Sequence, residues 1–525
     1  MSKQTAVPNG QKEMIMHEPG YNAEKKRVQF PVSWIWIAAT AALCMVFTLG
    51  LVPIAAAQGN GGRPPSAPGQ SLNIQNNRKY TSTIQNVFDF IQRQYVEEVD
   101  PKILFEGAMT GMLNALEDPY SSFLPEAEMI DLNDTTQGNF GGVGLYVSKP
   151  LGLRPDGKPN YIEVASPIED TPGWRAGINP GDLIIEVDGE ATDILTQDEA
   201  VSRLRGSPGV DVKLLIRRGE KLEFPVTLTR AIIEVPTAKH AMIGETGYLK
   251  LLTFTPMTAA RARDAINEFK AANYKSFILD LRNNYGGLLN SAVDISSLFL
   301  DGGVVVSTKS RIPQENHVFN AQKAAQVTED IPVVVLINKG SASASEIVAG
   351  ALKDRGRAYL VGEKSYGKGS VQQVYNLDNV GFKITTARYY TPSDVNIDKI
   401  GIPPDLEVKF PEFTEADAEK LNELINDNKI FTFIKENPQA GAAQVEAFAR
   451  TLERDYKLDF SLLKRLIRNE LNRTTIAPVY DLEYDVQLQE AVKILQNGSY
   501  RRLMQNTRTL KDLQEEALED LPLAS

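Results

Sequence analysis

The sequence predicts a multidomain chain in which a small β module precedes an α/β core, with helical segments at both ends and one transmembrane helix near the N-terminus. The length of 525 residues fits three or four folded units at about 150 residues per domain. Short β-rich runs separated by glycines occupy residues 139–230, and apolar strand candidates alternate with amphipathic helices over residues 231–410. An uncharged apolar stretch at 32–57 is long enough to cross a bilayer of about 30 Å.

Composition excludes several classes of function. The net charge of −11 lacks the basic field that phosphate backbones require, so nucleic acid is not an expected partner. The single cysteine, Cys44, cannot build a disulfide framework or a cysteine zinc site within the chain. Of the three histidines, only His240 and His317 could serve a catalytic triad or metal site in the exported part, and neither has a motif around it. We therefore expect neither a metal nor a cofactor.

The apolar stretch determines the expected compartment. Three basic residues at 25–27 precede it, and Trp34 and Trp36 lie where an interfacial aromatic belt would be, so residues 1–31 should be a cytoplasmic leader. A cleaved signal peptide ending near Ala55–Ala57 is the alternative, but the long leader favours a retained anchor. We expect a single-pass protein of the bacterial inner membrane with a periplasmic or otherwise extracytoplasmic body.

The remaining segments follow from composition and periodicity. Residues 58–75, rich in Gly, Pro, Ser and Gln, are typical of a flexible tether. Helical periodicity predicts an N-terminal helical subdomain at 76–138 and a C-terminal helical region at 411–525, in which Thr414 could cap the first helix with Asp417. Within the core we expect strands at 247–252, 276–282, 332–338 and 358–362, and helices at 258–272, 289–299 and 344–354.

A serine-rich stretch links the strand at 332–338 to the following helix. A serine at such a junction lies at the positive end of the helix dipole, beside free backbone N–H groups that can stabilise an oxyanion. Ser341, Ser343 and Ser345 could equally be helix caps, and capping alone would be the preferred interpretation.

Lys368 lies in a glycine-flanked loop after the strand at 358–362. A lysine in an apolar pocket loses proton affinity and can accept the proton of a serine, so a Ser-Lys dyad would need no histidine. The alternative is an ordinary solvated loop lysine. The run 362–368 also resembles a phosphate-binding loop, but Gly369 replaces the required Ser or Thr and a strand follows, which excludes a nucleotide site.

Two glycine-rich turns could present backbone N–H groups to a ligand. The buried strand at 276–282 runs into Gly286 and Gly287, where a missing Cβ lets N–H groups approach a bound carbonyl; an ordinary tight turn is the alternative. The loop from Gly142 to Leu145 could form an anion nest beside an exposed strand edge, or a plain hairpin.

Residues 331–405 resemble the C-terminal processing peptidases, or tail-specific proteases, through the Ser-Ala-Ser-Glu helix start, the Gly-Lys-Gly loop and the closing Gly-Ile-Pro-Pro-Asp at 401–405. The resemblance implies that Ser343 is the nucleophile, Lys368 the base and Gln372 the residue that positions the lysine. It also implies an oxyanion hole formed by the N–H of Ala344 and that of Gly286 or Gly287.

The module at 139–230 resembles a PDZ domain. The match rests on the loop that receives a terminal carboxylate in that family and on the later segments 176–178 and 181–184. The loop residues are Gly142, Val143, Gly144 and Leu145. The resemblance implies a PDZ-like module before an α/β serine protease core at 231–410, and Arg205 could join the two.

Together these features predict a membrane-anchored serine endopeptidase that cleaves exported proteins near their C-termini. Its partners would be polypeptides with free C-termini and, through the N-terminal helix, the membrane; a homo-oligomer and an adaptor protein stay open. The alternative is a non-catalytic PDZ-type scaffold that binds peptides and retains the core as a relic.

Overall fold

The computed structural model describes most of the chain after the predicted tether, in the ranges 74–149, 159–219, 221–323, 325–410, 414–472 and 478–519. The predicted leader (1–31) and transmembrane anchor (32–57) lie outside the described residues, as does nearly all of the predicted tether (58–75). No helix within the described ranges is both long enough and apolar enough to span a membrane.

The largest unit contains a six-stranded sheet in the order β10-β11-β12-β15-β16-β19. The strands β11 to β19 run parallel, and β10 pairs antiparallel with β11. Every residue of β12 and β15 is buried, as expected for central parallel strands covered on both faces. The bounds are β10 (Ala238–Ile243), β11 (Thr246–Leu251), β12 (Ser276–Asp280), β15 (Val333–Ile337), β16 (Tyr359–Gly362) and β19 (Leu406–Glu407).

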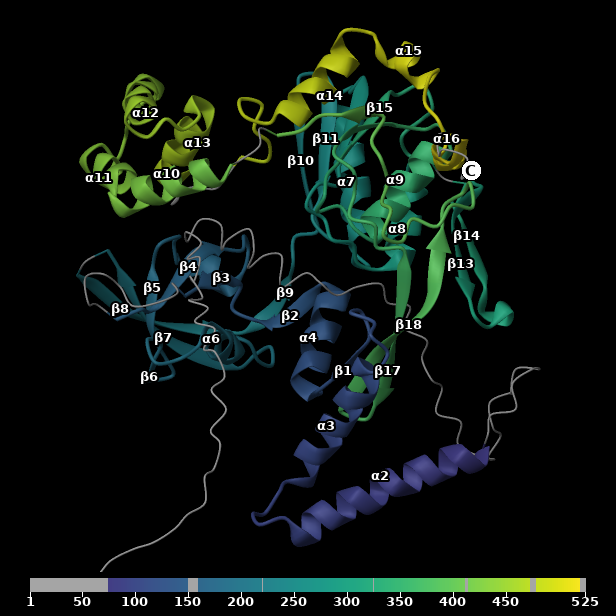
Figure 1. Ribbon diagram of the computed structural model, residues 1–525. Helices are drawn as coiled ribbons and strands as arrows, with labels where there is room; N and C mark the ends of the chain where they lie inside the picture. Colours follow the sequence, from purple (N-terminus) through teal and green to yellow (C-terminus); the bar gives the residue numbers. More distant parts are fainter. Residues whose placement is uncertain are drawn as a thin grey trace, which may run out of the picture.

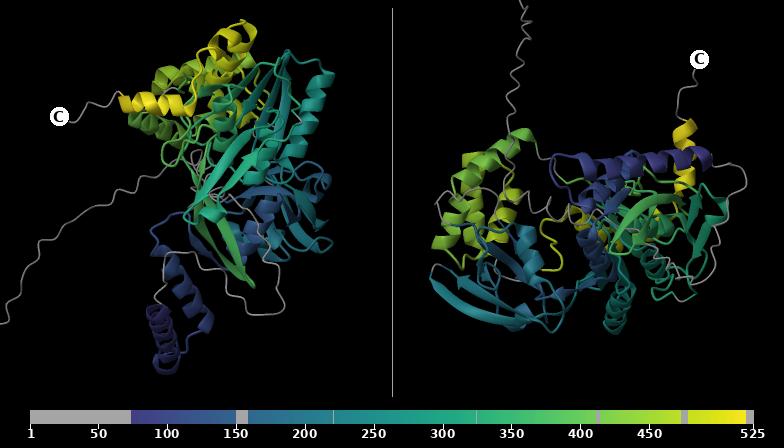
Figure 2. Two further views of the ribbon diagram at one scale, coloured as in Figure 1. Left: turned by 90° about the vertical axis from the view of Figure 1, so that its right-hand side faces the viewer. Right: turned by 90° about the horizontal axis from the view of Figure 1, so that it is seen from below.

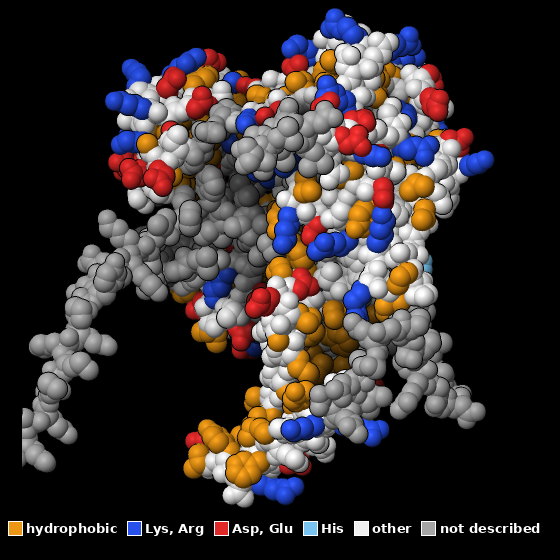
Figure 3. Space-filling view, turned by 45° about the vertical axis from the view of Figure 1, so that its right-hand side comes forward, with side chains coloured by type: hydrophobic (Ala, Val, Ile, Leu, Met, Phe, Trp, Pro, Cys, Tyr) orange, Lys and Arg blue, Asp and Glu red, His pale blue; other side chains and the backbone are white. Residues whose placement is uncertain are grey.

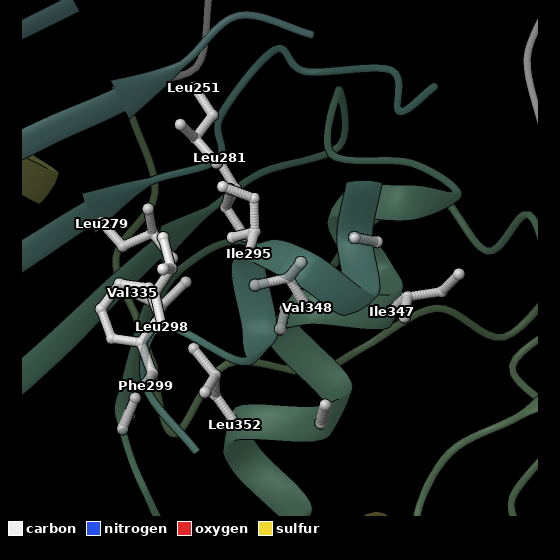
Figure 4. Close-up of a cluster of buried hydrophobic side chains, with 14 of the residues drawn as sticks. Leu251, Leu279, Leu281, Ile295, Leu298, Phe299, Val335, Ile347, Val348 and Leu352 are labelled. Atoms are coloured by element: carbon white, nitrogen blue, oxygen red, sulfur yellow. The ribbon is translucent and has the colours of Figure 1, made fainter. Parts of the chain in front are cut away.

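Helices cover both faces of this sheet (Figure 1). Val333 and Val335 of β15 pack into one hydrophobic core with α7 (Thr258–Ala271), α8 (Leu289–Ser296) and α9 (Ala344–Asp354). Figure 4 shows that core around Val335, with side chains of the sheet meeting those of α8 and α9.

The intervening residues of the same strand face the opposite way. Val334 and Leu336 pack against α14 (Val486–Gln496), so a helix near the C-terminus covers the second face of the sheet. Two short helices follow, α15 (Tyr500–Met504) and α16 (Leu510–Glu519).

The strands and helices that the sequence predicts for the core are present, with ends that differ by a few residues.

A second, antiparallel sheet, which the sequence analysis did not predict, lies beside the core. Its order is β1-β18-β13-β14, with β17 also paired to β18. The long hairpin of β17 and β18 extends toward the N-terminal helices (Figures 1 and 2). The short strand β1, which belongs to the same N-terminal region, pairs with β18. The bounds are β1 (Ser122–Leu124), β13 (Val304–Ser310), β14 (His317–Asn320), β17 (Ser370–Leu377) and β18 (Val380–Tyr390), with a 3-10 turn, η1 (Pro313–Glu315), between β13 and β14.

The N-terminal subdomain contains the helices α2 (Ile74–Gln94), α3 (Pro101–Asn114) and α4 (Glu126–Gln137). Hydrophobic side chains gather on the surface of these helices (Figure 3). The exposed ones include Tyr80, Phe90, Ile103 and Met112.

The glycine-rich module is a β sheet with its own hydrophobic core. Its sheet order is β3-β4-β5-β7-β8, with β6 paired to β5, and a ribbon of β2 (Asn139–Gly142) and β9 (Ala231–Glu234) joins it to the rest. The other bounds are β3 (Leu145–Ser148), β4 (Ile162–Pro167), α5 (Pro172–Arg175), β5 (Leu183–Val187), β6 (Glu190–Ala191), α6 (Gln197–Leu204), β7 (Asp211–Arg218) and β8 (Leu222–Thr229).

Between β19 and α14 the chain forms a separate helical bundle with its own core. Thr414 caps its first helix: its hydroxyl accepts the Asp417 N–H, and the Asp417 carboxylate accepts the Thr414 N–H. This confirms the predicted cap. The bundle comprises α10 (Glu415–Asn426), α11 (Lys429–Glu436), α12 (Ala442–Tyr456) and α13 (Phe460–Leu471).

Candidate active site

Ser343 lies at the junction of β15 and α9, in a strained backbone conformation. Its φ of 54° and ψ of −114° are unusual for a residue with a side chain, and such strain is concentrated at functional sites. The neighbouring hydroxyls have structural partners: Ser341 Oγ donates to the carbonyl of Leu281 at 2.8 Å and Ser345 Oγ to that of Asn284 at 2.7 Å. These bonds tie the helix start to the turn after β12.

Tyr389 joins the serine to the lysine loop. Its side chain is hydrogen-bonded to that of Ser343, and its hydroxyl donates to the backbone carbonyl of Lys368. Burial raises the pKa of Tyr389 well above its usual value, so this phenol stays neutral. The predicted nucleophile and the loop that carries the predicted base are therefore in the same small region.

Lys368 is nearly buried, with 7 % of its surface exposed. Burial lowers its pKa from 10.5 to about 8, and the nearby charge of Lys383 acts in the same direction. The carboxylates of Glu346 and Asp118 act in the opposite direction. At this pKa a useful fraction of the amine is neutral near physiological pH, as a general base requires.

Glu346 connects the serine and the lysine through its carboxylate. One carboxylate oxygen accepts the N–H groups of Ser343 and Lys368, both at 2.8 Å. The other accepts the N–H of Gly367 at 2.7 Å and the hydroxyl of Ser365 at 2.5 Å. This fully buried acid thus fixes the spacing between the helix start and the glycine loop. The sequence showed Glu346 only as part of the helix-start motif, and its bonds to residues 365–368 follow from the fold.

Gln372, the predicted positioning residue for the lysine, is buried on β17. Its side-chain N–H donates to Ser370 Oγ at 2.9 Å and to Thr385 Oγ1 at 3.2 Å. Thr385 donates in turn to the carboxylate of Asp118 at 2.6 Å. Gln372 therefore belongs to a network that ends at Asp118, an acid whose charge acts on Lys368.

The glycine turn after β12 contacts the serine directly. Gly286 has a φ of +108°, and a Cβ added there would lie 2.8 Å from Ser343 Cβ and 3.0 Å from the backbone nitrogen of Ala344. Its own N–H donates to the side chain of Asn284 at 2.9 Å. Gly287 packs instead against Phe254, whose carbonyl would lie 2.2 Å from an added Cβ. The structure thus places Gly286 beside Ser343 and Ala344. Gly287 instead lies against the backbone at Phe254.

A buried ionic cluster holds the start of this turn. Arg282 donates to the carboxylates of Asp280, at 2.7 Å, and Asp485, at 2.6 Å, and to the side chain of Gln487 at 3.0 Å. Burial alone would raise the pKa of Asp280, but the charge and hydrogen bonds of Arg282 lower it to about 2. Tyr248 completes the cluster by donating to Asp280 at 2.7 Å.

The predicted carboxylate-binding loop lies between β2 and β3. Gly142 ends β2, Val143 is buried, Gly144 has a φ of +75° and Leu145 begins β3. Among the strands of the described module, β3 lies at the end of the sheet with β4 as its partner, so its other edge could accept an added strand.

Arg205 contacts the N-terminal subdomain. Its guanidinium pairs with Asp134 of α4 at 3.9 Å and lies 4.9 Å from the centre of the Phe140 ring. The structure therefore shows it joining the glycine-rich module to the N-terminal subdomain.

Sequence models of known families match three segments of the chain. The model of "Peptidase family S41" matches residues 245–408, and a PDZ domain model matches residues 163–218. The model of the "Activating protease CtpB N-terminal domain" matches residues 61–127.

Named relatives agree with these matches. A carboxy-terminal-processing protease of Bartonella bacilliformis is 41% identical over 345 residues, which cover 65% of this chain and 77% of that protein. The carboxy-terminal processing protease CtpA of Bacillus subtilis is 33% identical over 342 residues, covering 64% and 71% of the two chains. The solved structure of a photosystem II D1 C-terminal processing protease superposes with a TM-score of 0.39 at 28% identity, over 64% of this chain and 96% of that one.

The sequence motifs, the PDZ match and the identity to these relatives agree, and the chain therefore belongs to the C-terminal processing peptidases of peptidase family S41.

Proposed function

We propose that this serine peptidase is anchored in the membrane by residues 32–57 and cleaves exported polypeptides near their C-termini with a Ser343–Lys368 dyad. The observation that carries the proposal is the buried amine of Lys368, with a pKa of about 8, in a loop joined to the strained serine by the carboxylate of Glu346. The family and its relatives support the class of reaction.

The dyad would act in two steps. Neutral Lys368 accepts the proton of Ser343 as the serine oxygen attacks the peptide carbonyl, and the resulting ammonium returns that proton to the leaving amine. Water then attacks the acyl-enzyme, with Lys368 accepting a proton from water and returning it to Ser343. Each step returns the amine to its neutral form, so the protons balance without a metal or cofactor.

The oxyanion would be stabilised by backbone N–H groups at the start of α9 and in the glycine turn. Ala344 supplies one, since it follows the nucleophile at the positive end of the helix. Gly286 or Gly287 supplies the other. Use of Gly286 requires its N–H to leave the side chain of Asn284, which it binds in this structure.

The PDZ module would select the tail of the substrate. The loop from Gly142 to Leu145 would receive the terminal carboxylate, while the tail adds a strand along β3. The family membership and the position of β3 at the end of its sheet support this role.

The sequence also supports the proposed compartment. The uncharged stretch at 32–57, with three basic residues before it, supports an anchor in the bacterial inner membrane and a periplasmic or extracytoplasmic body. Fractionating cells that express the full chain or a form lacking residues 1–57 tests this: the anchor predicts release of the shortened form from membranes. Equal membrane retention of both forms would contradict it.

The activity is tested by incubating the purified protein with an unstructured polypeptide and mapping the fragments by mass. Ser343→Ala and Lys368→Ala should each abolish cleavage and leave the fold intact. Lys364→Ala removes an exposed lysine of the same loop and serves as the matched control. Full activity in either dyad variant would overturn the dyad. A wild-type protein that neither cleaves nor reacts with a serine-directed phosphonate, with substrate present, would favour a peptide-binding scaffold.

A further inference from the structure

The segment after α3 docks against the hairpin that carries the lysine loop. Ser122 pairs with Lys383 where β1 meets β18, and the hydroxyl of Ser121 accepts the backbone N–H of Thr385 at 3.1 Å. Residues 118–122, distant in sequence from the protease core, are thereby held beside the base of the proposed dyad. No motif in the sequence had indicated this contact.

Asp118 is fixed in this position by three donors. Its carboxylate accepts the hydroxyl of Thr385 at 2.6 Å, the hydroxyl of Ser121 at 2.5 Å and the N–H of Tyr120 at 3.1 Å. Burial would raise the pKa of Asp118, but these hydrogen bonds lower it below the usual value. The acid is therefore ionised, and its charge acts on Lys368.

Tyr120 presents its ring to the amine itself. Nζ of Lys368 lies 4.7 Å from the centre of the Tyr120 ring, within the range of a cation–π contact. The Tyr120 hydroxyl is hydrogen-bonded to Tyr366. Tyr366 lies in the lysine loop, two positions before Lys368, so this bond anchors the Tyr120 ring to that loop.

We propose that Asp118 and Tyr120 complete the catalytic site as positioning residues for the amine of Lys368, contributed by the N-terminal subdomain. The proposal rests on the Ser343–Lys368 dyad. It makes the docking of residues 118–122 on β18 a condition of activity, which gives the N-terminal subdomain a direct part in the chemistry.

The charges around the amine predict the direction in which the pKa of Lys368 should shift when Asp118 is changed. Asp118 and the Tyr120 ring favour the ammonium form, as does Glu346 from α9, while Lys383 from β18 opposes it. Neutralising Asp118 must therefore lower the pKa of Lys368. Since the neutral amine is the base, the acid limb of the activity profile moves to lower pH.

The experiment compares pH profiles of kcat/KM for Asp118→Asn and for Glu117→Gln, which removes the adjacent exposed carboxylate. We expect Asp118→Asn to shift the midpoint of the acid limb down by about half a pH unit or more, with a lower kcat, and Glu117→Gln to leave both unchanged. A purely structural role for Asp118 would lower the rate without moving the limb, and an unmoved limb in a folded Asp118→Asn protein overturns the proposal.

Tyr120 supplies a second comparison in case Asp118→Asn does not fold. Tyr120→Phe keeps the ring but loses its bond to Tyr366, whereas Tyr120→Leu removes the ring. We expect kcat to fall about twofold for the first and about tenfold for the second, and the acid limb of the second also to move to lower pH. Equal kcat values and equal profiles for the two variants overturn the proposal. Activity in Ser343→Ala or Lys368→Ala would refute the dyad instead, so the two failures are distinguishable.

Discussion

Arg282 Nη2 and Asp485 Oδ2 form an ion pair at 2.6 Å, although the two residues are 203 positions apart. Arg282 follows β12 and precedes the glycine turn at the serine, while Asp485 caps the start of α14. The pair therefore fastens a helix near the C-terminus to the backbone that contacts Ser343. Part of the C-terminal region is thus built into the protease core, whereas the bundle of α10 to α13 has a separate core.

Asp485→Ala should weaken both the fold and the active site. Losing one carboxylate of a buried cluster leaves the guanidinium of Arg282 partly uncompensated, at a cost of about 2–4 kcal/mol in the free energy of unfolding. We expect kcat to fall about tenfold with little change in KM, since the turn and not the substrate contact is disturbed. Urea unfolding and steady-state kinetics check this. Glu453→Ala, which breaks the exposed pair with Arg450, should cost less than about 1 kcal/mol and leave kcat unchanged; similar losses in the two variants would contradict the role of Asp485.

Gly286→Ala should abolish activity. A Cβ at this position would press on Ser343 Cβ at 2.8 Å and on the carbonyl of Ala342 at 2.9 Å, so Ser343 or the turn must move. Gly244→Ala is the matched control, because Gly244 also has a positive φ but an added Cβ meets nothing within 4 Å. We expect it to lose about 1 kcal/mol of stability and no activity. Labelling with a serine-directed phosphonate measures the reactivity of the serine in both variants, and thermal unfolding measures their stability. Normal labelling of Gly286→Ala would refute the predicted contact.

Glu346→Gln should separate the serine from the lysine loop. The amide cannot replace a carboxylate that accepts four donors, because its NH₂ group must face at least one N–H or hydroxyl. Leaving a buried donor unsatisfied costs about 1–3 kcal/mol, and we expect a loss of activity of about a hundredfold from displacement of the base. Glu363→Gln changes a less buried acid that pairs with Lys339 at 3.7 Å and should have little effect. Thermal unfolding and cleavage rates measured together would show whether activity falls further than stability alone explains.

Activity should rise with pH up to about 8 and then level. The dyad requires neutral Lys368, and the amine is protonated below its pKa of about 8, so kcat/KM falls tenfold per pH unit on the acid side. A peptide substrate without titratable groups near the cleaved bond isolates this ionisation. A profile that is flat from pH 6 to 9, or that rises toward acid, would contradict a lysine base at this pKa.

Local sequence was enough to predict most elements of the core, and the resemblance to a peptidase family singled out the two residues of the proposed dyad. The alternation of apolar strands and amphipathic helices between 247 and 362 has a clear period, and the bounds differ from the structure by a few residues. Ser343 and Lys368 stand in short motifs, a strand-to-helix junction and a glycine-flanked loop, that can be recognised without knowing the fold. The second sheet was missed because β1 is only three residues long and its pairing with β18 depends on a partner far along the chain.

The contacts that tune the site depended on the tertiary structure alone. Thr385 reaches Asp118 across 267 positions, and the partners of Glu346 in the lysine loop lie 19 to 22 positions after it, so neither contact leaves a periodic pattern in the sequence. The same holds for the glycine turn, where packing against Phe254 and Ser343 distinguishes Gly287 from Gly286. Side-chain chemistry, periodicity and turn propensity are properties of the local sequence, and they determined which reactions the residues could support. Burial and long-range hydrogen bonds exist only in the folded structure. They decided the charge state, the spacing and the neighbours of the residues proposed to act in catalysis.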